Sequence, residues 1–257
     1  MHLKKIQHPI LTCEKISYGF FSRLGGFSTK PYKSLNCSFN NNDNKNNVIK
    51  NINIVKEDLN LKKIIKLNQI HSSEVVIIEK LNDISDFYNV DSIVTKIPGI
   101  GLSILGADCA PILFYDKIEK IIAACHAGWR GAVDNIVEKT IHKMESIGAK
   151  RNQISAVIGP AIQKNSYEIG QEVADIIQSC SFFSNKIPIL SYKINDKYLF
   201  NLPLFLQQCL KNAEIVNIGN VELDTYTNPH LFFSHRRSSH KNMNETGRQI
   251  SVIGILE

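Results

Sequence analysis

Residues 101–125 read GLSILGADCAPILFYDKIEKIIAAC and contain three apolar runs separated by polar turns. The runs at 101–105, 112–115 and 120–125 have the length of β-strands, and such nearly continuous apolar runs are typical of strands covered on both faces. Further short runs of this kind occur at residues 74–78, 156–158, 216–218 and 250–256. The central stretch therefore predicts a sheet buried in the core of the fold.

Amphipathic helices are predicted on both sides of this stretch. Apolar residues recur at helical spacing at residues 48–59, 136–147, 171–180 and 203–212, and Gly148 is expected to end the second of these helices. Strands and helices are mixed without strict alternation, so the sequence predicts an α+β fold, a layered α/β sandwich with mixed β-sheets. No Pro/Gly/Ser-rich linker divides the chain, and residues 1–257 are expected to form a single catalytic domain. The Asn-rich segment 40–47 is expected to be a solvated loop.

The composition is that of a globular protein with a slightly basic surface. The 257 residues include 30 Lys or Arg and 24 Asp or Glu, for a net charge of +6, and 43% are hydrophobic. The positive charges are diffuse, and no apolar run reaches the length of a membrane span. Six cysteines are scattered without a CxxC pair, which favours a reducing compartment. We therefore expect a cytoplasmic protein that acts on small molecules, with no nucleic-acid or membrane partner; the oligomeric state is left open.

Polar segments at residues 68–71, 106–111, 125–131 and 232–237 interrupt the apolar pattern. The first three contain His71, Cys109 and His126. Two imidazoles and one thiolate suit Zn²⁺, and three protein ligands leave a fourth position open for water or substrate. The spacing by itself is a weak signal, because hydrogen-bonded core histidines and a small buried cysteine would give the same pattern. The three residues are therefore a candidate metal site.

Two neighbours of these residues have alternative roles. Cys125 competes with Cys109 as the sulfur ligand, but adjacent side chains on a strand point to opposite faces, so Cys125 is expected in the core. Asp108 is predicted either to orient a ligand imidazole or to act as a general base. A turn in which the Asp108 side chain bonds its own backbone explains this residue almost as well.

Several arginines lie in glycine-rich or aromatic segments. Arg130 follows a glycine turn at the start of a predicted helix, where free N–H groups and a guanidinium favour anion binding. The others are Arg23, Arg236, Arg237 and Arg248. A phosphate site forms if some of these converge; otherwise they are solvated side chains beside tight turns.

These motifs together resemble the family of laccase-domain proteins, once described as multicopper polyphenol oxidases and related to bacterial purine nucleoside phosphorylases and peptidoglycan editing factors. The matching segments are GFFSRLGGFS (19–28), SLN (34–36), QIH (69–71), ADCAP (107–111), HAGWRG (126–131), IGPAI (158–162), YEIG (167–170), FFSHRR (232–237) and TGR (246–248). They follow the order of the family and span nearly the whole chain. The ADCAP and HAGWRG segments together are highly specific.

The resemblance implies a zinc enzyme, with copper the less favoured metal. It places the ligands on His71, Cys109 and His126. The implied activity is phosphorolysis of adenosine, inosine and methylthioadenosine to the free base and the (methylthio)ribose 1-phosphate, with adenosine deamination at the same site. The expected catalytic residues are Asp108, Cys109, His126 and Arg130. Substrate and phosphate binding is expected at Arg23, Asn36, Gln69, Tyr167, His235, Arg236 and Arg237.

The chain departs from the family pattern in two places. Asp224-Thr225 stands where the family usually has a Cys-Thr pair, and the segment 238–245 is longer than usual. The role of that cysteine and the substrate preference of the family therefore cannot be carried over directly to this chain.

Other functions are compatible with the same residues. Cys109 and His126 suit a cysteine hydrolase, and the family name also suggests an editing hydrolase for peptidoglycan precursors. A copper oxidase is disfavoured, because the 8 histidines include no His-x-His pair. A binding module without activity does not explain why histidines, a cysteine and arginines interrupt apolar strands at glycine turns.

Overall fold

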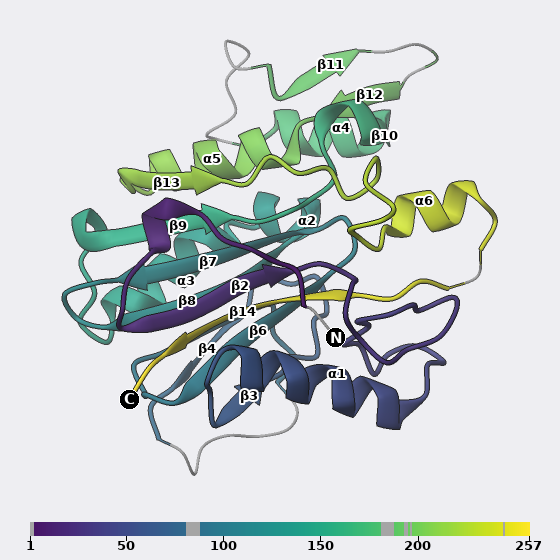
Figure 1. Ribbon diagram of the computed structural model, residues 1–257. Coiled ribbons are helices and arrows are strands. Elements are labelled where there is room, and N and C mark those ends of the chain that lie inside the picture. Colours follow the sequence, from purple (N-terminus) through teal and green to yellow (C-terminus); the bar gives the residue numbers. More distant parts are fainter. Residues whose placement is uncertain (1–2, 81–87, 181–187, 193–194, 196, 244) are drawn as a thin grey trace.

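Two large β-sheets stack face to face in the computed structural model, which describes residues 3–80, 88–180, 188–192, 195, 197–243 and 245–257 (Figure 1). The five-stranded sheet has the order β1 (Lys5–Ile6), β2 (Ile16–Phe21), β14 (Gln249–Ile255), β6 (Ile100–Gly106), β3 (Lys63–Ile65). The six-stranded sheet has the order β13 (Asn217–Asn220), β9 (Ile154–Ile158), β7 (Ala110–Asp116), β8 (Ile121–Ala127), β5 (Ser92–Thr95), β4 (Val75–Ile78). Both contain parallel and antiparallel pairs, which confirms the predicted α+β fold with mixed sheets.

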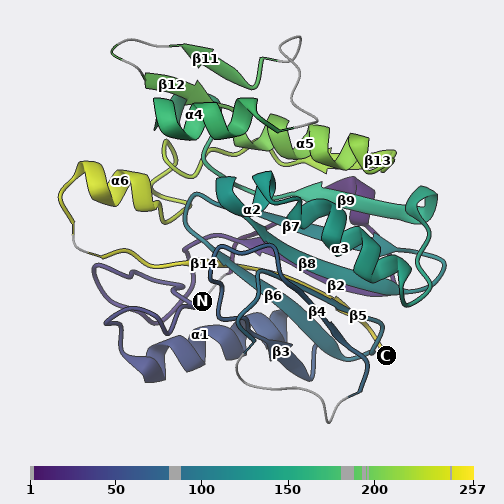
Figure 2. The ribbon, with the colours of Figure 1, turned by 180° about the vertical axis from the view of Figure 1, so that it is seen from behind.

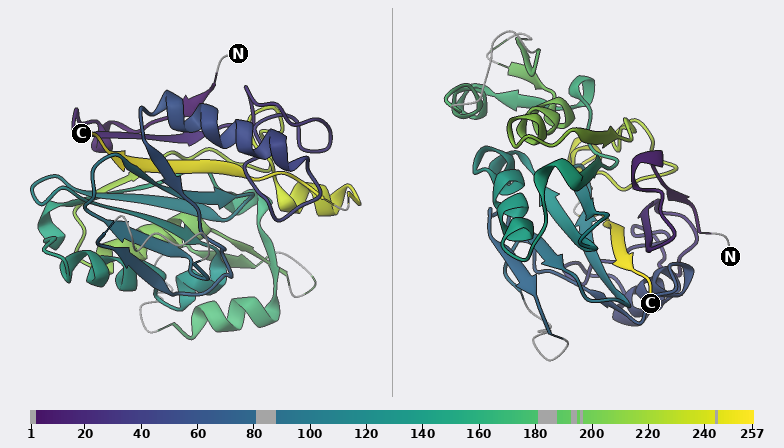
Figure 3. Two further views of the ribbon diagram at one scale, coloured as in Figure 1. Left: turned by 90° about the horizontal axis from the view of Figure 1, so that it is seen from below. Right: turned by 90° about the vertical axis from the view of Figure 1, so that its left-hand side faces the viewer.

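Helices cover the outer faces of both sheets. The side chains between the sheets form one apolar cluster, which includes Phe20, Leu113 and Ile253. On the far face of the six-stranded sheet lie α3 (Ile136–Glu145) and α5 (Leu202–Asn212), and on the far face of the five-stranded sheet lies α1 (Lys45–Asp58) (Figures 2 and 3). The layers therefore run helix, sheet, sheet, helix.

A third, smaller sheet lies beside α5. It has the order β10 (Glu168–Gly170), β12 (Lys197–Phe200), β11 (Leu190–Tyr192), and α4 (Gln171–Gln178) packs against it. Two short helices, α2 (Trp129–Val133) and α6 (His235–His240), follow strand and loop segments near the candidate site. Among the described residues, no helix has the length and apolar character needed to cross a membrane.

The predicted strands and helices are found close to their expected positions, but some elements were missed. The prediction for segment 40–47 is wrong in its last part, because α1 begins at Lys45. The side chain of Asn44 accepts hydrogen bonds from the N–H groups of Asn46 and Asn47 and so caps this helix. The apolar pattern of the sequence did not predict α6, because all six of its residues are polar.

A glycine after β9 allows the two sheets to approach closely. A Cβ atom built on Gly159 would lie 2.3 Å from Cδ1 of Phe20, which is buried between the sheets. We expect Gly159→Ala to lower the free energy of unfolding by about 1–3 kcal/mol, because the core would have to move. Urea unfolding measures this difference. Gly170→Ala is the control, because nothing lies within 4 Å of its Cβ position; equal destabilisation of the two variants would contradict this account.

Candidate active site and metal centre

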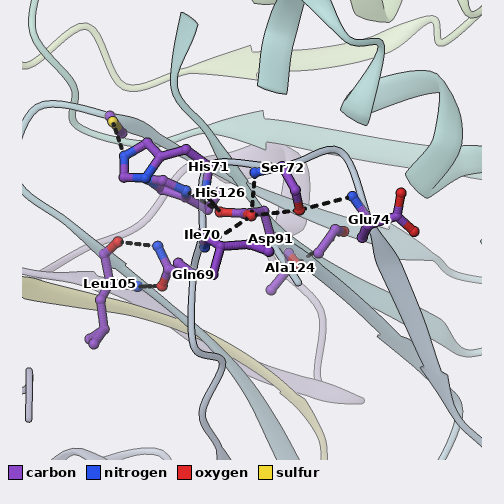
Figure 4. A network of polar contacts seen from close by, with 11 residues as sticks. Gln69, Ile70, His71, Ser72, Glu74, Asp91, Leu105, Ala124 and His126 are labelled. Carbon is purple, nitrogen blue, oxygen red and sulfur yellow. Dashed lines mark hydrogen bonds and ion pairs between the residues drawn. The ribbon is translucent and has the colours of Figure 1, made fainter. Parts of the chain in front are cut away.

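His71, Cys109 and His126 come together at one end of the six-stranded sheet. Their ligand atoms all lie within 4.8 Å of one another, and the Sγ atom of Cys109 is 3.9 Å from Nε2 of His71. The two imidazole rings meet edge to face with their centroids 4.9 Å apart. Figure 4 shows the His71 and His126 rings side by side. The segments that supply these residues are far apart in the sequence, so the fold builds the cluster.

Strand pairing explains the position of Cys109 and His126. β7 and β8 are antiparallel neighbours in which Pro111 is paired with His126, so Cys109 lies just beyond the same end of the hairpin. Cys125 points to the opposite face and is completely buried in the apolar cluster under α3 and α5. The expectation that Cys125 is a core residue is therefore confirmed.

The carboxylate that contacts an imidazole of the candidate metal site is Asp91, not Asp108. The Oδ1 atom of Asp91 lies 2.8 Å from Nδ1 of His126. The sequence analysis missed Asp91, and the only signal was an acidic residue before β5, a strand of four residues. Asp108 instead accepts hydrogen bonds from the Thr225 and Ser234 hydroxyls and from the N–H of Arg236.

Cys109 and His126 shift each other's proton affinity. Burial raises the pKa of the Cys109 thiol, but His126, together with His71, outweighs this effect and brings the pKa to about 6. Burial lowers the pKa of His126, while Cys109 and Asp91 raise it, with a net pKa of about 9. The metal-free pair is therefore a thiolate beside an imidazolium at neutral pH. A thiolate and two imidazoles form a donor set that suits Zn²⁺ and leaves one position open.

The thiolate gives Cys109 a distinctive reactivity. In metal-free protein we expect iodoacetamide to modify Cys109 at neutral pH, with the rate falling about tenfold per pH unit below pH 6 as the thiolate is protonated. Cys125 should not react, because burial raises its pKa to about 12. Mass spectrometry locates the modified residue, and added zinc should protect it. A rate midpoint near that of an ordinary thiol would contradict the assigned pairing.

The three candidate metal ligands line a cavity of about 370 Å³, which we call the main cavity because it contains them. It is lined by Ser38, Asn40, Leu67, Gln69, His71, Leu105, Gly106, Ala107, Cys109, His126, His235 and Arg248. The Gln69 side chain is fixed in one wall of this cavity. Its amide group donates to the Leu105 carbonyl and accepts from the Leu105 N–H, both at 2.8 Å. A second cavity of about 120 Å³, the side cavity, shares Ala107, Cys109 and His235 with the main cavity and adds Tyr167 and Arg236. The guanidinium of Arg236 lies 5.3 Å above the Tyr167 ring.

Several predicted binding residues line neither cavity. Arg23 donates to the carbonyls of Lys33 and Pro229, and Arg237 donates to three carbonyls in the segment 225–232. Asn36 is completely buried and joins the 36–43 loop to the backbone of Arg248. These three residues hold loops together in this structure.

Arg130 also lies outside both cavities. It is exposed on α2, and its guanidinium lies 4.5 Å above the Trp129 ring. Besides the two histidines of the candidate metal centre, the basic residues that line the main cavity are His235 and Arg248. Arg248 was noted in the sequence but was not among the expected binding residues.

The two departures from the family pattern both have structural roles. Asp224 accepts hydrogen bonds from the Ser166 hydroxyl and the Tyr226 N–H, and so joins the segment around Ser166 to its own turn. The first three residues of the segment 238–245 are not loop, because α6 extends to His240. Glu245 accepts two hydrogen bonds from Asn42. It also lines a further cavity together with His235 and Arg248.

Comparison with known proteins gives consistent matches along nearly the whole chain. Residues 17–256 match the family model described as multi-copper polyphenol oxidoreductase laccase. A purine nucleoside phosphorylase of Rickettsia prowazekii is 32% identical over 96% of this chain and 99% of its own length. One of Bacteroides thetaiotaomicron is 34% identical over 93% of this chain and 92% of its own length. A solved Neisseria meningitidis protein, 27% identical, superposes with a TM-score of 0.87 over 99% of both chains.

Proposed function

Because the chain belongs to the multi-copper polyphenol oxidoreductase laccase family, and relatives that it covers almost end to end are named purine nucleoside phosphorylases, we propose that it catalyses phosphorolysis of purine nucleosides. Adenosine, inosine and methylthioadenosine are the proposed substrates, with phosphate as the nucleophile. The main cavity is lined by residues from Ser38 to Arg248, which supports one catalytic domain over residues 1–257.

The observation that carries this proposal is a half-buried cation that lines the same cavity as the candidate metal centre. Arg248 lines the main cavity, and burial lowers its pKa. Its guanidinium donates to the carbonyls of Thr246 and Gly247, and no carboxylate among the described residues lies within 4.0 Å of it. An arginine without an acidic partner in a cavity favours an anionic ligand, and phosphate accepts hydrogen bonds from the remaining N–H groups.

We assign a different part of the reaction to each group of residues in the site. Phosphate held by Arg248 and His235 attacks C1′ of the ribose while the bond from C1′ to the purine breaks, through an oxocarbenium-like transition state. The purine takes the bonding electron pair and needs a proton or an electropositive neighbour as it leaves. A zinc ion held by His71, Cys109 and His126 would supply Lewis-acid stabilisation and activate water. Tyr167 and Arg236 in the side cavity would bind the nucleoside.

Asp108 has a different proposed role from the one predicted. Its carboxylate already accepts three hydrogen bonds, two of them from Ser234 and Arg236 at the start of α6. These bonds fix the position of His235 between the two cavities. We therefore assign Asp108 to positioning His235 and Arg236, rather than to proton transfer.

Adenosine deamination at the same site is the second candidate. It is favoured by the three-ligand donor set, because an open coordination position suits attack of activated water on the purine ring. Both reactions would use one purine pocket, but they break different bonds. Phosphate attacks C1′ of the ribose and releases the base, whereas water attacks C6 of the adenine and releases ammonia.

The test is incubation of the purified protein with adenosine, with and without phosphate, with products separated by chromatography. Adenine that forms only with phosphate supports the phosphorylase, and inosine supports the deaminase. No turnover of any purine nucleoside by metal-loaded protein would contradict both and direct the search to peptidoglycan precursors. Turnover by fully metal-free protein would favour the cysteine hydrolase instead.

A further inference from the structure

A single buried carboxylate contacts both histidines of the candidate metal centre. Asp91 is completely buried. Its Oδ1 atom lies 2.8 Å from Nδ1 of His126 and accepts a hydrogen bond of 3.0 Å from the N–H of His71. Its Oδ2 accepts the N–H and the hydroxyl of Ser72 at 2.7 and 2.9 Å, and the N–H of Ile70 at 3.2 Å. Figure 4 shows Asp91 at the centre of this network, between the His126 ring and the 70–72 turn.

The bond to His126 determines which ring nitrogen can bind a metal. An ionised carboxylate only accepts hydrogen bonds, so Nδ1 of His126 must carry the proton. When the imidazolium gives up a proton to bind a metal, that proton therefore leaves from Nε2, and the lone pair forms on this nitrogen, which Asp91 does not contact. The backbone gives the same arrangement a second constraint, because the N–H of His126 donates to the carbonyl of Asp91 at 2.7 Å.

The bonds to the 70–72 turn hold His71 in a conformation that it would otherwise rarely adopt. His71 has a φ of 60°, in the left-handed region that non-glycine residues occupy infrequently. Three successive N–H groups, those of Ile70, His71 and Ser72, point at the Asp91 carboxylate. The turn therefore forms around this anion and places the His71 ring against Cys109.

We propose that Asp91 is the positioning residue of the metal centre, which sets the tautomer of His126 and the turn of His71 at the same time. This inference rests on metal binding by His71, Cys109 and His126 in the proposed function. It does not depend on which nucleoside is the substrate.

An isosteric amide cannot replace both functions of the carboxylate. In Asp91→Asn, an amide oxygen placed at the Oδ1 position leaves the NH₂ group facing the donors of Ile70 and Ser72. The opposite orientation points the NH₂ group at Nδ1 of His126 and moves the ring proton to Nε2, where it blocks metal binding. Either orientation loses one of the two ligands.

The test compares zinc affinity by chelator competition in the wild type and in Asp91→Asn. We expect the Asp91→Asn affinity to be about 10–100-fold weaker, the usual cost of losing a partner of a ligand histidine. Asp116→Asn is the matched control. Asp116 is also completely buried and accepts three backbone N–H groups, from Ile118, Glu119 and Lys150, but touches no ligand. Wild-type zinc affinity in Asp91→Asn would overturn the proposal.

A second measurement needs no variant and decides the matter if Asp91→Asn does not fold. In zinc-loaded wild-type protein, ¹⁵N spectra of the imidazoles should show His126 protonated at Nδ1 and bound to zinc through Nε2. Binding through Nδ1, or no zinc binding at all, would overturn the proposal. If these results hold but no purine is released with phosphate, the proposed function fails while the role of Asp91 stands.

Discussion

His126→Ala is expected to abolish phosphate-dependent purine release. The variant loses a proposed metal ligand, and the Lewis-acid stabilisation that the metal would supply is worth several kcal/mol, or at least about 10³-fold in rate. It also removes the partner of two buried groups, because Asp91 and Cys109 both face His126. The metal content of the variant should fall together with kcat/KM for the nucleoside.

The control for this variant is a histidine outside the site that also contacts acidic side chains. His142 lies on the exposed surface of α3, with Nε2 2.9 Å from Glu138 and Nδ1 3.2 Å from Glu145. His142→Ala should keep both metal and activity, because exposed ion pairs contribute little. Purine release by metal-free His126→Ala at the wild-type rate would contradict the proposed metal centre.

Arg248→Met is expected to weaken phosphate use by about 100-fold in kcat/KM for phosphate, since hydrogen bonds to a charged group are each worth about 1.5–3 kcal/mol. Methionine keeps much of the apolar stem, so the cavity wall should persist. The affinity for the nucleoside should change little, because the proposed contact is with phosphate alone. Initial rates at varied phosphate and saturating nucleoside separate the two effects.

Arg151→Met is the matched control for Arg248→Met. Arg151 bonds Glu138 and Glu145 on the surface and lines neither cavity. Its loss should leave the KM for phosphate unchanged. If both variants keep the wild-type KM, Arg248 is not the phosphate ligand and another cation must hold the nucleophile.

The sequence predicted the centre of the site because local rules decide it. The alternation of side chains along a strand separates Cys125 from His126, and the family motifs identify His71 and Cys109 as partners. The layered fold was predictable for a similar reason, since short runs made up entirely of apolar residues, such as 112–115, indicate which strands are buried on both faces.

The surroundings of the metal ligands depended on contacts that only the fold creates. Asp91 is 20 residues from His71 and 35 from His126, and nothing in its local sequence marks it. Arg23 and Arg237 were expected to bind substrate because they lie beside tight turns, and such turns also offer backbone carbonyls. Arg23 and Arg237 use their donors on those carbonyls, whereas Arg248 bonds two neighbouring carbonyls and still lines the main cavity.

The most direct test of the proposed function is to add zinc stepwise to metal-free protein and follow phosphate-dependent release of purine from adenosine. The proposal predicts a rate that rises in proportion to occupancy and stops rising at about one ion per chain, as a single three-ligand site requires. Ribose 1-phosphate should form in step with adenine. A full rate before any zinc is added, or no release at full occupancy, would contradict a zinc-dependent purine nucleoside phosphorylase.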